Sequence, residues 1–403
     1  MRARAEKIFI TTTFTLCDNN GYGSTQISNF FGRNEFPIAD GPDDADWIVI
    51  NTCAFDQSRE DEAATIITDY IRRFSAIKRI IVCGCLPKIS PELFRERNVI
   101  TIGPKELHRF NEHFRPQVPI ENISAGELNP RFISKDYGLL DCYYLQICQG
   151  CVNHCSYCAI KKAKGHVTSV APEKLVGEAE QAIKAGFSRI MLLGDDCGSY
   201  GADLGIGLCD LLQMISGCGA RICINYIHPS AFQQLYRQCG PTIFNCIEFI
   251  NVPIQATSAR ILDLMNRRYD ATAVMRTVRA VKAECPGTFF ETHMIYGFPS
   301  ETREEFEDTF SALNSFDSVI YFYYTDRKNT PAVLLKSHLS ASEMSFRTKQ
   351  LLSHERFTVD RETATPPVLL LGYDLKRPEE IFDYVARSRF DSGKDVVFLR
   401  GAR

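Results

Sequence analysis

The segment IIVCGCLPK, from Ile80 to Lys88, is an apolar strand-like run that ends in two cysteines. Two earlier runs end in the same way: KIFITTTFTLC reaches Cys17, and ADWIVINTC reaches Cys53. Helix-like segments follow these runs, and such alternation predicts a parallel sheet covered by helices. Ligands of such sheets bind beyond the carboxyl ends of the strands. We therefore expect the first two cysteines to meet one of Cys83 or Cys85 at a single edge of the sheet.

The length of 403 residues predicts two or three domains. A stretch rich in proline and polar residues separates two regions in which strands and helices alternate. The expected parts are an N-terminal α/β domain (1–114), a linker (115–137), a central domain (138–335) and a C-terminal extension (336–403).

The central domain contains six strand-like runs with helix-like segments between them. The runs are CYYLQIC, RIMLLG, ARICINYI, NCIEFINVP, GTFFETHMIYG and DSVIYFYYT. Six such units predict a partial (β/α)6 barrel, which is short of the eight units of a closed barrel. The predicted fold class is α/β: a Rossmann-like parallel sheet, this partial barrel, and a small C-terminal α/β segment. In that last segment we expect helices near 341–362 and 377–388.

The composition points to a cytoplasmic enzyme that binds metal. Sixteen cysteines are many for this length, but the chain opens with no secretory signal and has no apolar run of ~20 residues that could cross a membrane. Clustered cysteines in a reducing compartment indicate metal binding rather than disulfides. The net charge of -3 argues against a general nucleic-acid binder.

The strongest motif is CVNHCSYC, in which Cys151, Cys155 and Cys158 have the spacing C-x3-C-x2-C. Thiolates are the usual ligands of iron–sulfur clusters, and three of them leave one iron of a [4Fe–4S] cluster open. A zinc site is the alternative, but zinc sites usually take four ligands from paired C-x2-C motifs. The motif directly follows the first strand of the predicted barrel, and in this it resembles the radical S-adenosylmethionine (SAM) enzymes.

The strings NTC and GCL extend this resemblance to the methylthiotransferases, radical SAM enzymes that contain two clusters. The segments LCDNNGYGS, NTCAF, CGCLPK, IGPKELHRF, LLGD, VPIQATSARILDLMNR and IYGFPSETREEF are similar to family segments, and the similarity covers residues 7–335. It implies a second [4Fe–4S] cluster on Cys17, Cys53 and Cys85. Cys83 is then expected to be a small core residue.

The resemblance also implies which residues hold SAM. Tyr157 lies between two cluster cysteines, where the superfamily has an aromatic residue near the adenine. Gly194 and Asp195 follow the second barrel strand and are expected at the methionine ammonium group, since a carboxylate suits a cation. Asp196 is equally well explained as a helix cap. Gln255 follows the fourth strand and is expected to reach the ribose.

No catalytic residue is identified from the sequence, but two side chains are weak candidates for substrate contact. His293 lies late in the fifth barrel strand, where it is either a core histidine or a substrate contact. Glu291 shares its face because side chains alternate along a strand.

The implied activity is formation of a C–S bond, as sulfur insertion or methylthiolation, with the second cluster as sulfur donor or sulfur-binding site. The tRNA-modifying members of the family end in an RNA-binding β-barrel, whereas only about sixty residues follow the central domain here. We therefore expect a small-molecule substrate, such as a nucleotide or a secondary metabolite, and an electron donor such as flavodoxin or ferredoxin. A tRNA methylthiotransferase is the alternative, and an iron–sulfur electron carrier or regulator is a third.

Overall fold

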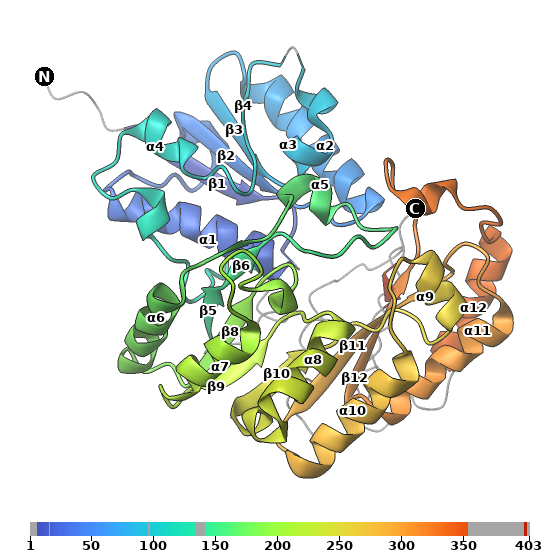
Figure 1. Cartoon of the computed structure of the whole chain (residues 1–403). Coiled ribbons are helices and arrows are strands. Elements are labelled where there is room, and N and C mark those ends of the chain that lie inside the picture. Colours follow the sequence, from blue (N-terminus) through green and yellow to red (C-terminus); the bar gives the residue numbers. More distant parts are fainter. Residues whose placement is uncertain (1–5, 16, 96, 134–141, 354–398, 401–403) are drawn as a thin grey trace, which may run out of the picture.

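A computed structural model describes residues 6–15, 17–95, 97–133, 142–353 and 399–400. The chain folds around two parallel sheets, each with helices packed on it (Figure 1). The predicted fold class is confirmed. The domain boundaries stay a prediction, and so does the helix near 377–388, which lies outside the described residues.

The first sheet has the order β1-β2-β3-β4, and all its neighbouring strands are parallel. Strand β2 is buried at every position, which explains why its sequence WIVINT is almost continuously apolar. The strands are β1 (Ile8–Thr12), β2 (Trp47–Thr52), β3 (Arg79–Gly84) and β4 (Ile100–Ile102). The helices of this domain are α1 (Asp18–Arg33), α2 (Gln57–Phe74), α3 (Leu86–Ile89) and α4 (Arg109–Phe114).

The second sheet contains the six predicted barrel strands in sequential parallel order and one further strand from the C-terminal segment. The strands are β5 (Cys142–Gln146), β8 (Arg189–Leu193), β9 (Arg221–Ile224), β10 (Ile247–Asn251), β11 (Phe289–Tyr296), β12 (Ser318–Tyr323) and β13 (Leu399–Arg400). The helices around it are α6 (Pro172–Lys184), α7 (Leu208–Ser216), α8 (Pro229–Cys239), α9 (Ala259–Leu264), α10 (Ala271–Glu284), α11 (Arg303–Asp308) and α12 (Ala341–Ser353).

The loop after β5 carries three short elements. Strands β6 (Cys148–Gln149) and β7 (Thr168–Ser169) form a small antiparallel pair, and helix α5 (Ile160–Lys164) lies between them in the chain. This loop lies between the two sheets in Figure 1, with α5 beside the N-terminal domain. The segment that carries the C-x3-C-x2-C motif is therefore held where the two domains meet.

The described part of the predicted linker, residues 115–133, packs against both sheets. Ile120, Ile123 and Phe132 are buried in the core of the first sheet, and Gly126 pairs with Tyr144 of β5. These contacts connect the first sheet to the first barrel strand. A disulfide joins Cys209 and Cys239, at the start of α7 and the end of α8. Among the described helices, none is both long and apolar enough to span a membrane.

Candidate metal centres and active site

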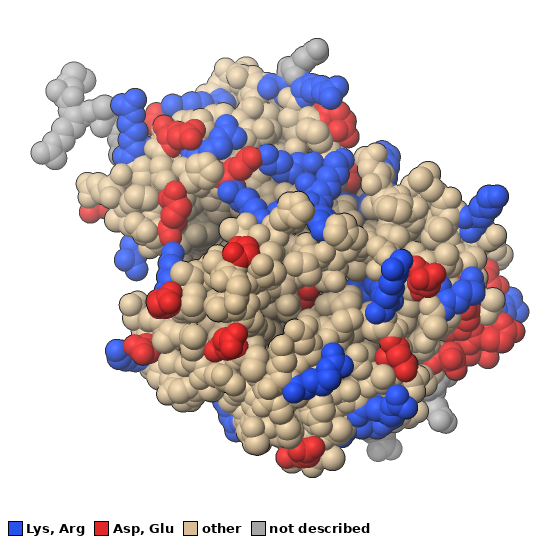
Figure 2. Space-filling model, viewed as in Figure 1, with Lys and Arg blue, Asp and Glu red and all other residues tan. Residues whose placement is uncertain are grey.

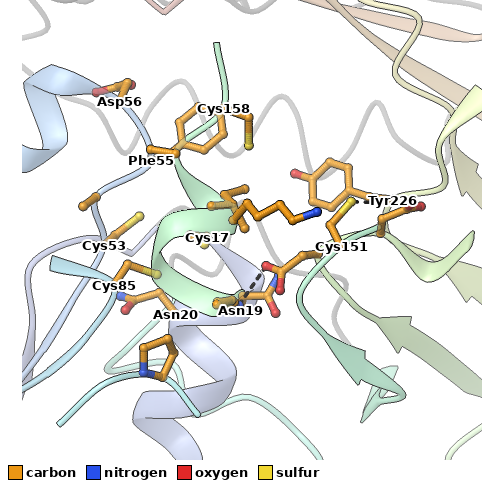
Figure 3. A pocket seen from close by; sticks show the side chains of 18 of the residues that line it. Cys17, Asn19, Asn20, Cys53, Phe55, Asp56, Cys85, Cys151, Cys158 and Tyr226 are labelled. Atoms are coloured by element: carbon orange, nitrogen blue, oxygen red, sulfur yellow. Dashed lines mark hydrogen bonds and ion pairs between the residues drawn. The ribbon is translucent and has the colours of Figure 1, made fainter. Parts of the chain in front are cut away.

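The two domains enclose one cavity of about 340 Å³. It lies beyond the carboxyl ends of strands from both sheets, and the molecular surface is hollowed between the two domains (Figure 2). All six cysteines predicted as cluster ligands line this cavity: Cys17, Cys53, Cys85, Cys151, Cys155 and Cys158. Figure 3 labels all of them except Cys155. The tertiary structure therefore brings both predicted triads to the same space.

The N-terminal triad is positioned by the ends of the first three strands. Cys17 is the residue before α1, Cys53 directly follows β2, and Cys85 directly follows β3. Gly84 is required before Cys85, since its φ is +94° and a Cβ atom there would lie 2.4 Å from the Thr52 carbonyl oxygen. A hydrogen bond between two of these thiols lowers the pKa of Cys17 and raises the pKa of Cys53.

Cys83 and Cys85 differ in their surroundings. The Cys83 side chain is fully buried in the core beneath the sheet, where its Sγ lies 3.6 Å from the Ile50 carbonyl oxygen. Cys85 instead lines the cavity. Side chains alternate along β3, but the chain turns at Gly84, so the two thiols do not point to the same side. The geometry favours Cys85 as the ligand.

Several N–H groups lie within hydrogen-bond distance of the cysteine sulfurs of the barrel triad. The backbone and side-chain nitrogens of Asn153 lie 3.4 and 3.2 Å from the Sγ of Cys151. A guanidinium nitrogen of Arg267 lies 3.3 Å from the Sγ of Cys155. Hydrogen bonds to cluster sulfurs are one of the means by which proteins set a cluster's reduction potential. Cys148 is not part of this triad, because it is buried in the barrel core.

The chemistry of both triads fits iron–sulfur clusters. Burial raises the pKa of Cys85 and Cys151 to about 11 and of Cys158 to about 12. Thiolates in such surroundings require a bound cation to offset their desolvation. Within the described residues, no three His, Cys, Asp or Glu side chains are arranged to hold a single metal ion. A cluster needs a wider arrangement than one ion, because each thiolate binds a different iron.

The residues predicted to hold SAM are only partly gathered at the cavity. Tyr157 and Gln255 line it, but Gly194 does not. Gln255 has a φ of 62°, and strained backbone of this kind concentrates at functional sites. Its buried Oε1 atom has no hydrogen-bond partner among the described residues. Gln255 can therefore accept a hydrogen bond from a ligand.

Asp195 lines the cavity, but its carboxylate is already engaged. One oxygen lies 2.8 Å from the ammonium nitrogen of Lys164, and the other accepts a hydrogen bond from the Gly150 N–H at 2.7 Å. Its predicted role toward the ammonium group of SAM stays a prediction. Asp196 caps the short turn Cys197–Ser199, which agrees with the alternative explanation from the sequence.

The two candidates for substrate contact share one neighbour. The Asn251 side-chain nitrogen lies 2.9 Å from Oε1 of Glu291 and 2.8 Å from Nε2 of His293. His293 lines the cavity, where its ring packs against Tyr226 and Phe322. Glu291 is fully buried behind it. Of these two candidates, only His293 is therefore placed to touch a substrate.

Three buried cations in the cavity wall were not predicted: Lys164, Arg267 and Arg327. Lys164 follows the cluster motif by six residues, and Arg267 ends the family-like string VPIQATSARILDLMNR, whereas Arg327 lies in none of the family-like strings. For Arg267 this string was the signal that the sequence offered. From the sequence alone these cations could not be told from ordinary surface charges.

Two family models match the chain. One is described as the radical SAM superfamily and matches residues 145–313, and the other is described as uncharacterized protein family UPF0004 and matches residues 7–102. The chain is 27% identical to a tRNA-2-methylthio-N(6)-dimethylallyladenosine synthase of Deinococcus radiodurans, over 86% of this chain and 72% of that protein. It is 28% identical to the ribosomal protein uS12 methylthiotransferase RimO of Alkaliphilus oremlandii, over 84% and 79%.

The chain is a methylthiotransferase-like radical SAM enzyme. The same comparisons confirm the expected cofactors, SAM and two [4Fe–4S] clusters. Among solved structures, the enzyme shares its fold with the radical SAM methyltransferase TsrM from Kitasatospora setae. That match has a TM-score of 0.57 and 15% identity, and it covers 82% of this chain and 77% of the other.

Proposed function

We propose that this enzyme attaches a methylthio group to a nucleoside of tRNA. Formation of a C–S bond is supported by relatives that act on tRNA and on a ribosomal protein. A relative of Pyrococcus horikoshii, 29% identical over 74% of the chain, is also described as a probable tRNA methylthiotransferase. The comparisons favour this alternative over the small-molecule substrate that the sequence alone suggested, and over an electron carrier or regulator.

The observation that carries the proposal is that both cysteine triads open onto one cavity. Cys151, Cys155 and Cys158 would hold the cluster that binds SAM. When bound, this cluster supplies the electron that cleaves SAM to a 5′-deoxyadenosyl radical. Cys17, Cys53 and Cys85 would hold the second cluster on the opposite wall, as the site of the sulfur that is transferred.

The remaining wall residues bind and orient the reactants. Tyr157 packs against Phe298, and its hydroxyl lies 3.4 Å from Arg267, so the ring is fixed beside the barrel triad. Gln255 offers its free Oε1 atom, as described above. His293 and Phe322 present rings to the cavity, against which a base can stack.

The size of the cavity limits what can enter it. A volume of about 340 Å³ must accommodate the reacting parts of SAM and of the substrate. An RNA substrate can therefore insert only one nucleoside, which must be turned out of its stack. The same volume is typical of small-molecule sites, and a free nucleotide or metabolite is for this reason the second candidate.

One experiment tests the roles of the two cysteine triads, and a second distinguishes the two candidate substrates. Replacing Cys151, Cys155 and Cys158 by Ala should halve the iron and abolish cleavage of SAM. Replacing Cys17, Cys53 and Cys85 should also halve the iron, yet preserve formation of 5′-deoxyadenosine. Full iron in the second variant would refute the assignment of the second cluster.

For the substrate, reduced enzyme is incubated with SAM and either tRNA or the small-molecule fraction of cells. A flavodoxin or ferredoxin, which stays the expected electron donor, can replace the chemical reductant. We expect methylthio-nucleosides in the digested tRNA, detected by mass spectrometry. Consumption of SAM that responds only to the small-molecule fraction would favour the second candidate.

A further inference from the structure

Three lysines from two segments that are distant in sequence gather beside the cluster loop. Lys105 follows β4, and Lys161 and Lys162 lie on α5. In the described part of the chain none of the three forms an ion pair, whereas nearby Lys88 pairs with Glu106. Asp195 and Asp203 act on Lys105 electrostatically, but in the described part of the chain no carboxylate lies within ion-pair distance of any of the three lysines.

Contacts to the surrounding loops hold the lysines in place. The Lys162 ammonium nitrogen lies 2.6 Å from the Ile89 carbonyl oxygen, and that of Lys105 lies 2.9 Å from the Thr168 hydroxyl. The Lys161 ammonium nitrogen lies 2.7 Å from Nε2 of His154. None of these partners is a carboxylate, so the contacts position the ammonium groups without pairing them with a negative charge.

The group continues toward the barrel through His154. The carbonyl oxygen of His154 accepts a hydrogen bond of 2.7 Å from the side chain of Asn266, and the exposed Arg268 lies two residues further along. Arg268 also has no ion pair within the described residues. We call Lys105, Lys161, Lys162 and Arg268 together the basic surface. In Figure 2, lysine and arginine side chains gather in the middle of the visible face, over α5.

The basic surface borders the cavity, because Lys161 belongs to both. The whole chain has a net charge of -3, so this concentration of cations is local. Free cations at a cavity mouth attract an extended anion whose reacting part enters the cavity. A nucleic acid fits this description, since its phosphates provide regularly spaced negative charge.

We propose that the basic surface binds the phosphate backbone of the RNA whose nucleoside enters the cavity. This inference rests on the proposed function and deepens it by naming the surface. Phosphate contacts of this kind set the register of the RNA and leave the choice of base to the cavity. They also make the affinity depend on salt, because each neutralised phosphate releases counterions.

The test compares two variants, each with four cations changed to Gln. The first replaces Lys105, Lys161, Lys162 and Arg268. The matched control replaces four exposed cations elsewhere, on the barrel domain and on α12: Lys174, Lys184, Arg237 and Lys349. Binding of a fluorescently labelled tRNA is measured by anisotropy between 50 and 200 mM salt, and iron content and thermal unfolding are measured to verify that both variants are intact.

We expect the slope of log affinity against log salt to be smaller by about 3 in the basic-surface variant than in the wild type, at ~0.7–0.9 per phosphate contact. The control should keep the wild-type slope. An unchanged slope in the basic-surface variant, with wild-type enzyme that binds and modifies tRNA, overturns this inference alone. Wild-type enzyme that neither binds nor modifies tRNA overturns the proposed substrate, and the inference with it.

Discussion

The ammonium nitrogen of Lys164 lies 2.8 Å from a carboxylate oxygen of Asp195, and both side chains are almost completely buried. This ion pair lies in the cavity wall, and Lys164 interacts electrostatically with Cys85 and Cys17 of the N-terminal triad. The pair belongs to the barrel domain, yet it places a positive charge beside the predicted ligands of the other domain.

Removing one partner of this ion pair should lower the free energy of unfolding. Lys164→Met leaves the Asp195 carboxylate buried without a cation, and breaking such a pair typically costs about 3–5 kcal/mol. We expect this loss in the free energy of unfolding of the cluster-free protein, measured by chemical denaturation. The double variant Lys164→Met/Asp195→Asn should recover most of it, because no isolated charge remains. Equal stability of the single and double variants would contradict this account.

Cys83 and Cys85 provide a matched pair of substitutions two residues apart. Cys85→Ala should lower the iron and sulfide content by up to half, since Cys85 lines the cavity. Cys83→Ala should keep the full content and lose only about 1 kcal/mol of stability, as expected for a small core truncation. Chemical analysis of anaerobically purified protein distinguishes the two. The opposite pattern would reverse the ligand assignment.

Arg327 connects the barrel to the loop that carries Cys53. Its guanidinium donates to the Ala54 carbonyl oxygen and lies 3.4 Å from the Glu60 carboxylate, and both side chains are buried. Arg327→Met should destabilise the protein by about 3 kcal/mol, because Glu60 loses its cation. It should also reduce retention of the second cluster, because the loop beside Cys53 is released.

The control for Arg327 is Lys328→Met at the exposed neighbouring position. Thermal unfolding and iron content are measured on both variants. Wild-type iron content in Arg327→Met would show that the Cys53 loop is held by other contacts.

His228 should make stability depend on pH. Burial, with Arg267 nearby, lowers the pKa of His228 to about 3 in the folded protein, against 6.5 for a free histidine. Between these values the unfolded chain binds a proton and the folded protein does not, so stability falls as the pH decreases below 6.5. Above pH 6.5 this effect is absent.

The substitution that tests this is His228→Asn, because Asn can also accept the Ser230 N–H that the histidine ring accepts at the start of α8. Relative to the wild type, the variant should gain up to about 2 kcal/mol of unfolding free energy on going from pH 7 to pH 5. His166→Asn, at an exposed histidine, is the control. The same pH profile in wild type and His228→Asn would exclude His228 as the source.

The sequence by itself determined the two parallel sheets and the cysteines at their edges. Strand and helix patterns are local, and a cysteine that follows a buried parallel strand such as β2 can lie only at the carboxyl edge of its sheet. The sequence pattern predicts a helix over 57–74, and α2 has these limits, with Asp56 capping its first turn. The same pattern predicts a helix over 22–33, whereas α1 begins at Asp18, because the chain turns into the helix directly after Cys17.

Only the tertiary structure decided how the two domains face each other and which charges meet there. Arg327 lies 3.4 Å from Glu60, although 267 positions of the chain separate them. Contacts to the loops likewise place Lys105 on the same surface as Lys161 and Lys162, although nothing in the sequence distinguishes these lysines from ordinary surface residues. The net charge of the chain did not reveal the basic surface, because it does not depend on where the charged residues lie. Packing of one sheet edge against the other is a long-range property, and no local pattern of residues encodes it.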